Sequence, residues 1–116
     1  MTKHTISIDV HLDSEKMPEH IDWHATGSSQ AEPTSAKAFM LSLWDGQEKT
    51  ALKIDLWTKK MMVDEMNDFF YQTMMTMAET FKNATRNEAL AEEYKEFARN
   101  FKRKADEALM EAENNK

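Results

Sequence analysis

Histidine and aspartate alternate on two short segments near the start of the chain, and these residue types together could bind a metal ion. Asp9 and His11 share one face of an alternating segment, and Asp22 and His24 share one face of the next. An antiparallel pairing that sets His11 opposite Asp22 also sets Asp9 opposite His24, with Cβ atoms about 5 Å apart. Imidazole and carboxylate groups both bind Zn²⁺. The pattern therefore makes these four residues candidates for a surface metal site.

The same four residues have a simpler interpretation, as complementary pairs on the solvated face of a sheet. Ligands confined to one flat sheet surround a metal ion poorly, and no further residue in the pattern would orient them. We therefore favour surface pairs over a metal site. His4 and His20 lie outside this arrangement and are expected to be solvated.

Other patterns that carry chemistry are missing from the sequence. A phosphate cradle needs several glycines so that backbone N–H groups can converge, and the chain has only Gly27 and Gly46. It has no cysteine for a thiolate nucleophile, a disulfide or a thiolate metal site. No serine lies on a recognisable nucleophile elbow. We expect no enzyme activity and no cofactor.

Two tryptophans indicate protein contacts instead. Met40, Trp44 and Trp57 are expected on one face of a hairpin, opposite the face that carries its leucines and isoleucine. Large aromatic side chains on an uncovered sheet face are typical anchors of protein–protein interfaces. The alternative is that the loop at residues 26–36 or the connector at residues 58–63 folds over them.

Methionine is unusually frequent, at 10 of 116 residues. Flexible thioethers can line a groove that accepts a partner helix, and they also fill ordinary cores. Met75 lies roughly opposite the main apolar stripe of its predicted helix, so it is the methionine hardest to bury without a neighbour. We include it among the candidate partner-binding residues.

Alternating hydrophobicity predicts four strands that would position these side chains, at about residues 4–13, 20–26, 37–45 and 51–58. Residues 36–44 could also continue as a helix behind Pro33, but the following Asp45-Gly46 turn signal favours a hairpin. This hairpin would have the facing pairs Phe39–Leu56, Leu41–Ile54 and Leu43–Leu52. The polar segment at residues 26–35 is expected to be a mobile loop.

Apolar residues at three- and four-residue steps predict two helices, at about residues 64–83 and 86–113. Thr85 and Glu88 have the spacing of a capping box at the start of the second. The order ββββαα predicts an α+β fold: a two-layer sandwich in which an antiparallel two-helix hairpin covers one face of a four-stranded antiparallel sheet made of two hairpins.

Length and charge narrow the class of protein. With 116 residues we expect a single domain over residues 1–116. A net charge of −6 argues against wide contact with nucleic acid, whose phosphates need clusters of Lys and Arg. The sequence has no run near eighteen apolar residues and no apolar segment of a signal peptide near its start. We expect a cytoplasmic protein without membrane insertion.

Three segments carry a family resemblance: MLSLWD at residues 40–45, IDLWTK at residues 54–59 and VDEM at residues 63–66. They resemble the GldC family of gliding-motility-associated proteins of Bacteroidota. The first strand, HTISIDVHLD, also fits, so the resemblance covers nearly the whole chain. It implies a small cytoplasmic protein associated with the gliding machinery, and it implies no catalytic residue or cofactor.

Together, the residues and the resemblance predict a non-enzymatic accessory protein that contacts a protein of the gliding machinery, and a homodimer is compatible with the same face. The alternative function is a small-ligand or metal-binding module. It would use the His/Asp face of the sheet or a pocket between the sheet and the helices.

Overall fold

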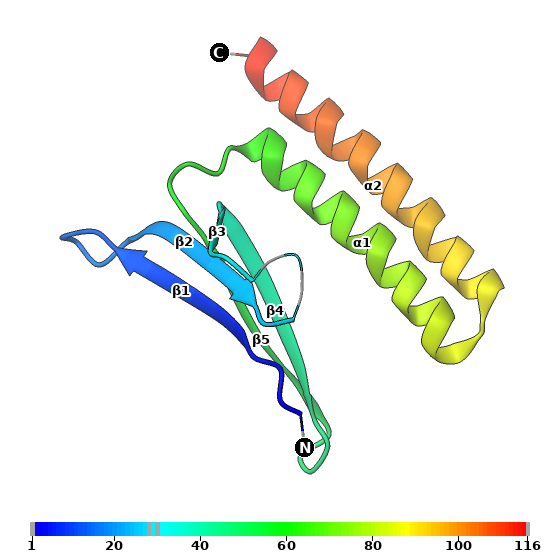
Figure 1. The fold of residues 1–116 in the computed structure, drawn as a ribbon. Coiled ribbons are helices and arrows are strands. Elements are labelled where there is room, and N and C mark those ends of the chain that lie inside the picture. Colours follow the sequence, from blue (N-terminus) through cyan, green and yellow to red (C-terminus); the bar gives the residue numbers. More distant parts are fainter. Residues whose placement is uncertain (1, 28, 30, 116) are drawn as a thin grey trace. The chain divides into compact units, whose positions relative to one another are not determined.

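The computed structural model describes residues 2–27, 29 and 31–115, and Figure 1 traces their fold. The chain forms two compact units, residues 1–61 and residues 62–116. The first unit contains the strands and the second contains two helices. An α+β fold with antiparallel strands and two helices is therefore confirmed. The packing of helices on a sheet in a single domain stays a prediction.

The expected single four-stranded sheet is wrong, because the strands of the first unit form two sheets. β1 (Ile6–Leu12), β2 (Pro18–Ala25) and β3 (Thr34–Ala36) form one antiparallel sheet in that order. β4 (Ala38–Asp45) and β5 (Thr50–Trp57) form the other. The chain bends at Lys37, between β3 and β4, and this bend ends the pairing with β2.

The segment predicted as a mobile loop contributes the short strand β3. Thr34, Ser35 and Ala36 pair with Trp23, Asp22 and Ile21 of β2, so the end of this segment is ordered structure. Part of the predicted loop, at Ser28 and Gln30, lies outside the described residues.

The register predicted for the first two strands is also wrong. Asp9 faces Asp22 and His11 faces His20, and the register shifts between His11 and Leu12. The physical reason is the turn after β1. The Asp13 carboxylate accepts hydrogen bonds from the backbone N–H groups of Glu15 (2.8 Å) and Met17 (3.0 Å). These bonds form a tight turn directly after β1.

The register predicted for the second hairpin is confirmed, with Leu43 facing Leu52, Leu41 facing Ile54 and Phe39 facing Leu56. The apolar face formed by these pairs is not buried towards the turn end of the hairpin. Leu43, Leu52 and Ile54 are each more than half exposed. Among the described residues of this unit, Ile21 of β2 is a large side chain that is fully buried, and Ala36 faces it.

The two helices of the second unit agree with their predicted bounds. α1 spans Val63–Thr85 and α2 spans Glu88–Asn114. The predicted capping box at Thr85 is wrong, because Thr85 is the last residue of α1. Its hydroxyl donates to the Phe81 carbonyl oxygen (2.8 Å). The N-cap of α2 is Asn87, whose side-chain oxygen accepts from the Leu90 N–H (3.1 Å).

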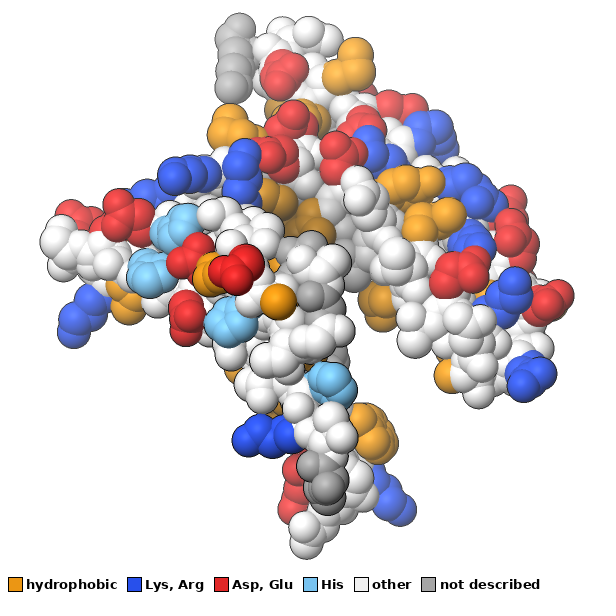
Figure 2. Space-filling model, viewed as in Figure 1, with side chains coloured by type: hydrophobic (Ala, Val, Ile, Leu, Met, Phe, Trp, Pro, Cys, Tyr) orange, Lys and Arg blue, Asp and Glu red, His pale blue; other side chains and the backbone are white. Residues whose placement is uncertain are grey.

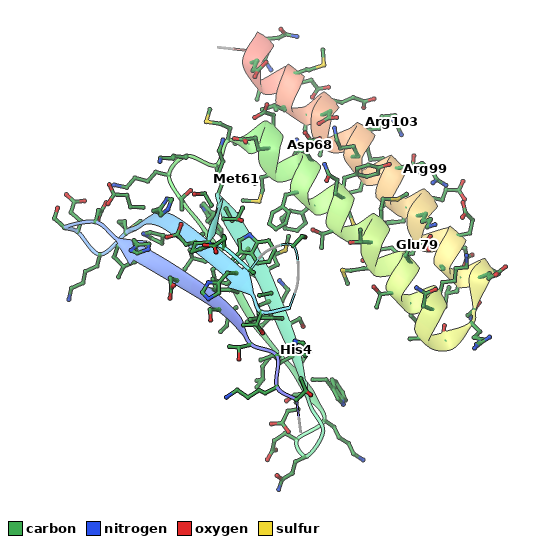
Figure 3. All side chains as sticks on the ribbon, in the orientation of Figure 1. His4, Met61, Asp68, Glu79, Arg99 and Arg103 are labelled. Atoms are coloured by element: carbon green, nitrogen blue, oxygen red, sulfur yellow. The ribbon has the colours of Figure 1, made fainter. Side chains whose placement is uncertain are left out.

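Small side chains let α1 and α2 pack closely. Ala78 of α1 and Ala91 and Ala98 of α2 are buried, and charged pairs join the helices beside them. Figure 3 labels two of the acidic partners, Asp68 and Glu79, on α1. Lys102 lies 3.1 Å from the Asp68 carboxylate, and Lys95 forms an ion pair with Glu79.

Candidate protein-binding site

The β4–β5 hairpin positions the two candidate tryptophans at opposite ends of one sheet face. Trp44 faces Ala51 next to the turn, and Trp57 faces Ala38 at the far end. Because side chains alternate along a strand, Met40 lies on the same face as Trp44. The predicted face is therefore assembled as expected, whereas partner binding by it stays a prediction.

The turn that ends this hairpin is held by the Asp45 carboxylate. It accepts hydrogen bonds from the backbone N–H groups of Gln47 (2.9 Å) and Glu48 (3.1 Å). Lys49 adopts φ 57°, and its N–H donates to the Asp45 carbonyl oxygen (2.8 Å). A short turn fixed in this way sets the register of both strands and hence the position of Trp44.

Both tryptophan side chains are accessible to a partner. Trp44 is 69% exposed and Trp57 is 59% exposed, whereas Met40 is half-buried. Between them on the same face, Lys53 and Asp55 of β5 form an ion pair. The face thus combines two large apolar anchors with a charged centre. The fourth candidate, Met75, is half-buried on α1 in the other unit.

The four candidate metal ligands do not form the expected arrangement. Figure 2 shows histidine and acidic side chains gathered over β1 and β2. With the corrected register, Asp9 faces Asp22 and His24 faces Ser7, so the alternating square of His and Asp is absent. A two-residue slip keeps each side chain on its face, which is why alternation along the strands could not reveal it.

A different cluster forms, and it includes a histidine that the sequence patterns left out. Nε2 of His20 lies 2.7 Å from Asp22 Oδ1, and Nε2 of His11 lies 3.1 Å from Asp22 Oδ2. The two imidazole rings are 5.5 Å apart between centroids. Burial raises the pKa of the Asp22 carboxyl, but the hydrogen bonds from His20 and His11 outweigh this, and the net effect lowers the pKa. The sequence signal that could have identified His20 is its position two residues before Asp22, which places both side chains on the same face of β2.

No group of three or more His, Asp or Glu side chains suited to a metal ion occurs among the described residues. An apolar hollow of about 170 Å³ in the first unit is lined by side chains that include Ile8, Trp23 and Phe39. Pockets for small molecules usually enclose about 300–1,000 Å³. Neither feature favours a ligand-binding module over a protein-binding face.

None of the helices in the described part of the chain is long and apolar enough to cross a membrane. A search of curated proteins and a search of solved structures each gave no match. The model of the family described as gliding motility-associated protein GldC-like matches residues 18–107. This span contains the three segments on which the resemblance depends, and β1 lies outside it. The chain belongs to the GldC-like family of gliding motility-associated proteins.

Proposed function

We propose that this chain is a non-enzymatic accessory protein of bacterial gliding, which acts in the cytoplasm by binding a protein of the gliding machinery. The face that carries Met40, Trp44 and Trp57 is the binding site in this proposal. Membership of the family supports the association with gliding. The observation that carries the binding site is the high exposure of both tryptophans on one face of one hairpin.

The chemistry of this face fits protein recognition. A buried tryptophan removes about 150–250 Å² from water, and an interface typically depends on a few such anchors. The Lys53–Asp55 ion pair between the tryptophans supplies polar groups that can orient a partner. Two exposed tryptophans beside an ion pair are typical of a binding surface, so the proposal assigns protein binding to this face.

The proposal is tested by a double variant, Trp44→Ala and Trp57→Ala. A matched control is the double variant Leu43→Ala and Leu52→Ala, on the same two strands but on the opposite face. The control residues are 56% and 55% exposed, so both changes remove exposed apolar side chains. Circular dichroism and thermal unfolding verify that both variants fold.

Each tagged protein is expressed in a gliding bacterium that lacks its own copy, and two quantities are measured. They are the amounts of gliding-machinery proteins that co-purify and the rate of cell movement over a surface. We expect the tryptophan variant to lose a co-purifying machinery protein and to reduce gliding, while the control keeps both. Unchanged partners and gliding in the tryptophan variant would reject this face as the binding site.

A further inference from the structure

The outer edge of β5 carries a sequence that suits pairing with a second copy of itself. Within the described residues, β5 pairs with β4 on one edge and with no strand on the other. From Thr50 to Thr58 the sequence reads TALKIDLWT, which is nearly symmetric about Ile54. Leucines lie two positions to either side of this centre. Lys53 and Asp55 lie one position to either side of this centre and carry opposite charges.

The backbone of β5 has the geometry that such pairing needs. The Thr58 N–H donates to the Lys37 carbonyl oxygen (2.8 Å), one step beyond the pair Ala38–Trp57. Because hydrogen-bonded pairs alternate along an antiparallel ladder, Ile54 directs its N–H and C=O towards β4. Lys53 and Asp55 therefore direct theirs away from β4, to the outer edge.

We propose that two copies of the chain pair antiparallel through this outer edge of β5, with a two-fold axis at Ile54. In this register Lys53 of each copy faces the partner's Asp55, and their outward backbone groups form hydrogen-bonded pairs. Leu52 faces the partner's Leu56, and Ala51 faces the partner's Trp57, a small residue opposite a large one. The two hairpins then form one four-stranded sheet with all six of these leucine and isoleucine side chains on a single face.

Charge also selects this register over its neighbours. Moving the axis by one residue along β5 sets Lys53 opposite the partner's Lys53, or Asp55 opposite the partner's Asp55. Like charges directly opposite each other destabilise a strand pair, whereas opposite charges stabilise it. β1 and β4 lack this complementarity, because each carries one aspartate and no lysine or arginine. The second copy of β5 is thus the strand that fits best.

Pairing also satisfies a structural need of this hairpin. A two-stranded sheet is at best marginally stable in water, and an open edge presents unpaired N–H and C=O groups. Thr50–Asp55 is exposed along its whole length. This inference goes beyond the proposed function and does not depend on it, since purified protein alone tests it.

Single cysteines provide the first test, because the chain has none of its own. Facing residues on the axis lie about 4.5 Å apart between Cα atoms, within the range of a disulfide. Ile54→Cys is therefore expected to form a disulfide-linked dimer on mild oxidation. Leu52→Cys is the matched control, since Leu52 and Ile54 are both 55% exposed. In the proposed pairing the two residues at position 52 lie about 13 Å apart along the strands, so they should not link.

Charge reversal provides the second test, with dimer formation measured by analytical ultracentrifugation. Lys53→Asp should raise the dimer Kd about tenfold, because each of two attractive pairs becomes repulsive. The double variant Lys53→Asp, Asp55→Lys should restore the dimer, since it exchanges the charges and keeps them opposite. Arg103→Glu on α2 controls for a change in net charge. A monomeric protein, equal linking at positions 52 and 54, or no rescue by the exchanged pair would each overturn the proposal.

Discussion

At the scale of single residues, the Asp13 carboxylate connects two segments of the first unit. It accepts from two backbone N–H groups of its own turn and forms an ion pair with Lys59, far away in the sequence. The hydrogen bond from Lys59, with that from the Met17 N–H, lowers the pKa of Asp13 to about 2 from 3.8. One side chain thus joins the β1–β2 turn to the segment after β5.

This pKa predicts how stability depends on pH. A carboxyl group whose pKa is lower in the folded state stabilises the protein above its unfolded pKa of about 3.9. The contribution is lost as the pH falls through the folded value of about 2. We expect Asp13→Asn, which keeps the acceptor oxygen but removes the charge, to lower the urea midpoint at pH 7. The difference from wild type should shrink between about pH 4 and pH 2.

The partner residue supplies the control for this prediction. In a Lys59→Met background the pKa of Asp13 is no longer lowered by the ammonium group. The Asp13→Asn change should then have a smaller effect at pH 7. An effect of the same size in both backgrounds would show that the ion pair is not the cause.

The two glycines of the chain predict a second contrast. Gly27 has φ +71°, and a Cβ there would lie 2.9 Å from Cε1 of His4. Gly46 has no atom within 4 Å of such a Cβ. Gly27→Ala should lower the free energy of unfolding by about 1–2 kcal/mol or more, because the left-handed conformation is unfavourable for alanine. Gly46→Ala should change the free energy of unfolding little. Chemical denaturation of both variants measures the two changes, and an equal loss in both would contradict the prediction.

At the scale of elements, the start of α2 depends on one side chain. The Asn87 side chain accepts from the Leu90 N–H, one of the N–H groups that has no partner within the helix. Asn87→Ala should reduce the free energy of unfolding by about 1 kcal/mol. Asn87→Asp is the matched control, because it keeps an acceptor oxygen at the N-cap. Equal loss in both variants, measured by denaturant unfolding, would contradict the capping role.

Still at this scale, the two hairpins of the first unit differ in how far the sequence specifies them. The β4–β5 turn occupies the few residues between Asp45 and Thr50, so apolar alternation and turn length together define one register. In the β1–β2 hairpin, the hydrogen bonds to Asp13 and the irregularity after His11 give a register that differs by two residues from the predicted one. That difference breaks up the predicted His/Asp square and brings His20 to Asp22 instead.

At the scale of the whole molecule, the chain keeps much apolar surface in contact with water. Its accessible surface is 9267 Å². Two fully separate compact bodies, each with half the mass, would together expose about 7,900 Å². The accessible surface of the chain is larger than this value, so the additional area belongs to the units themselves. Side chains such as Leu43, Trp44 and Phe97 are more than half exposed. Association with another protein surface would remove part of this area.

A dimer through β5 predicts that thermal stability depends on protein concentration. Mass action stabilises a folded dimer at higher concentration, so Tm should rise by about 3 °C for each tenfold increase. Differential scanning calorimetry over a hundredfold range of concentration measures this slope. Lys53→Asp should reduce the slope, and the exchanged pair Lys53→Asp, Asp55→Lys should restore it. A wild-type Tm that is independent of concentration would contradict the dimer.

The sequence by itself determined the type and approximate bounds of the main elements, the β4–β5 register and the family. Each depends on local periodicity, a short turn or contiguous motifs. The tertiary structure alone decided the division into two sheets at Lys37, the β1–β2 register and the outer edge of β5. The sheet division and the outer edge depend on pairing between strands distant in the sequence, and the β1–β2 register depends on a two-residue slip at the Asp13 turn. Such a slip leaves every side chain on its face, so hydrophobic alternation cannot detect it.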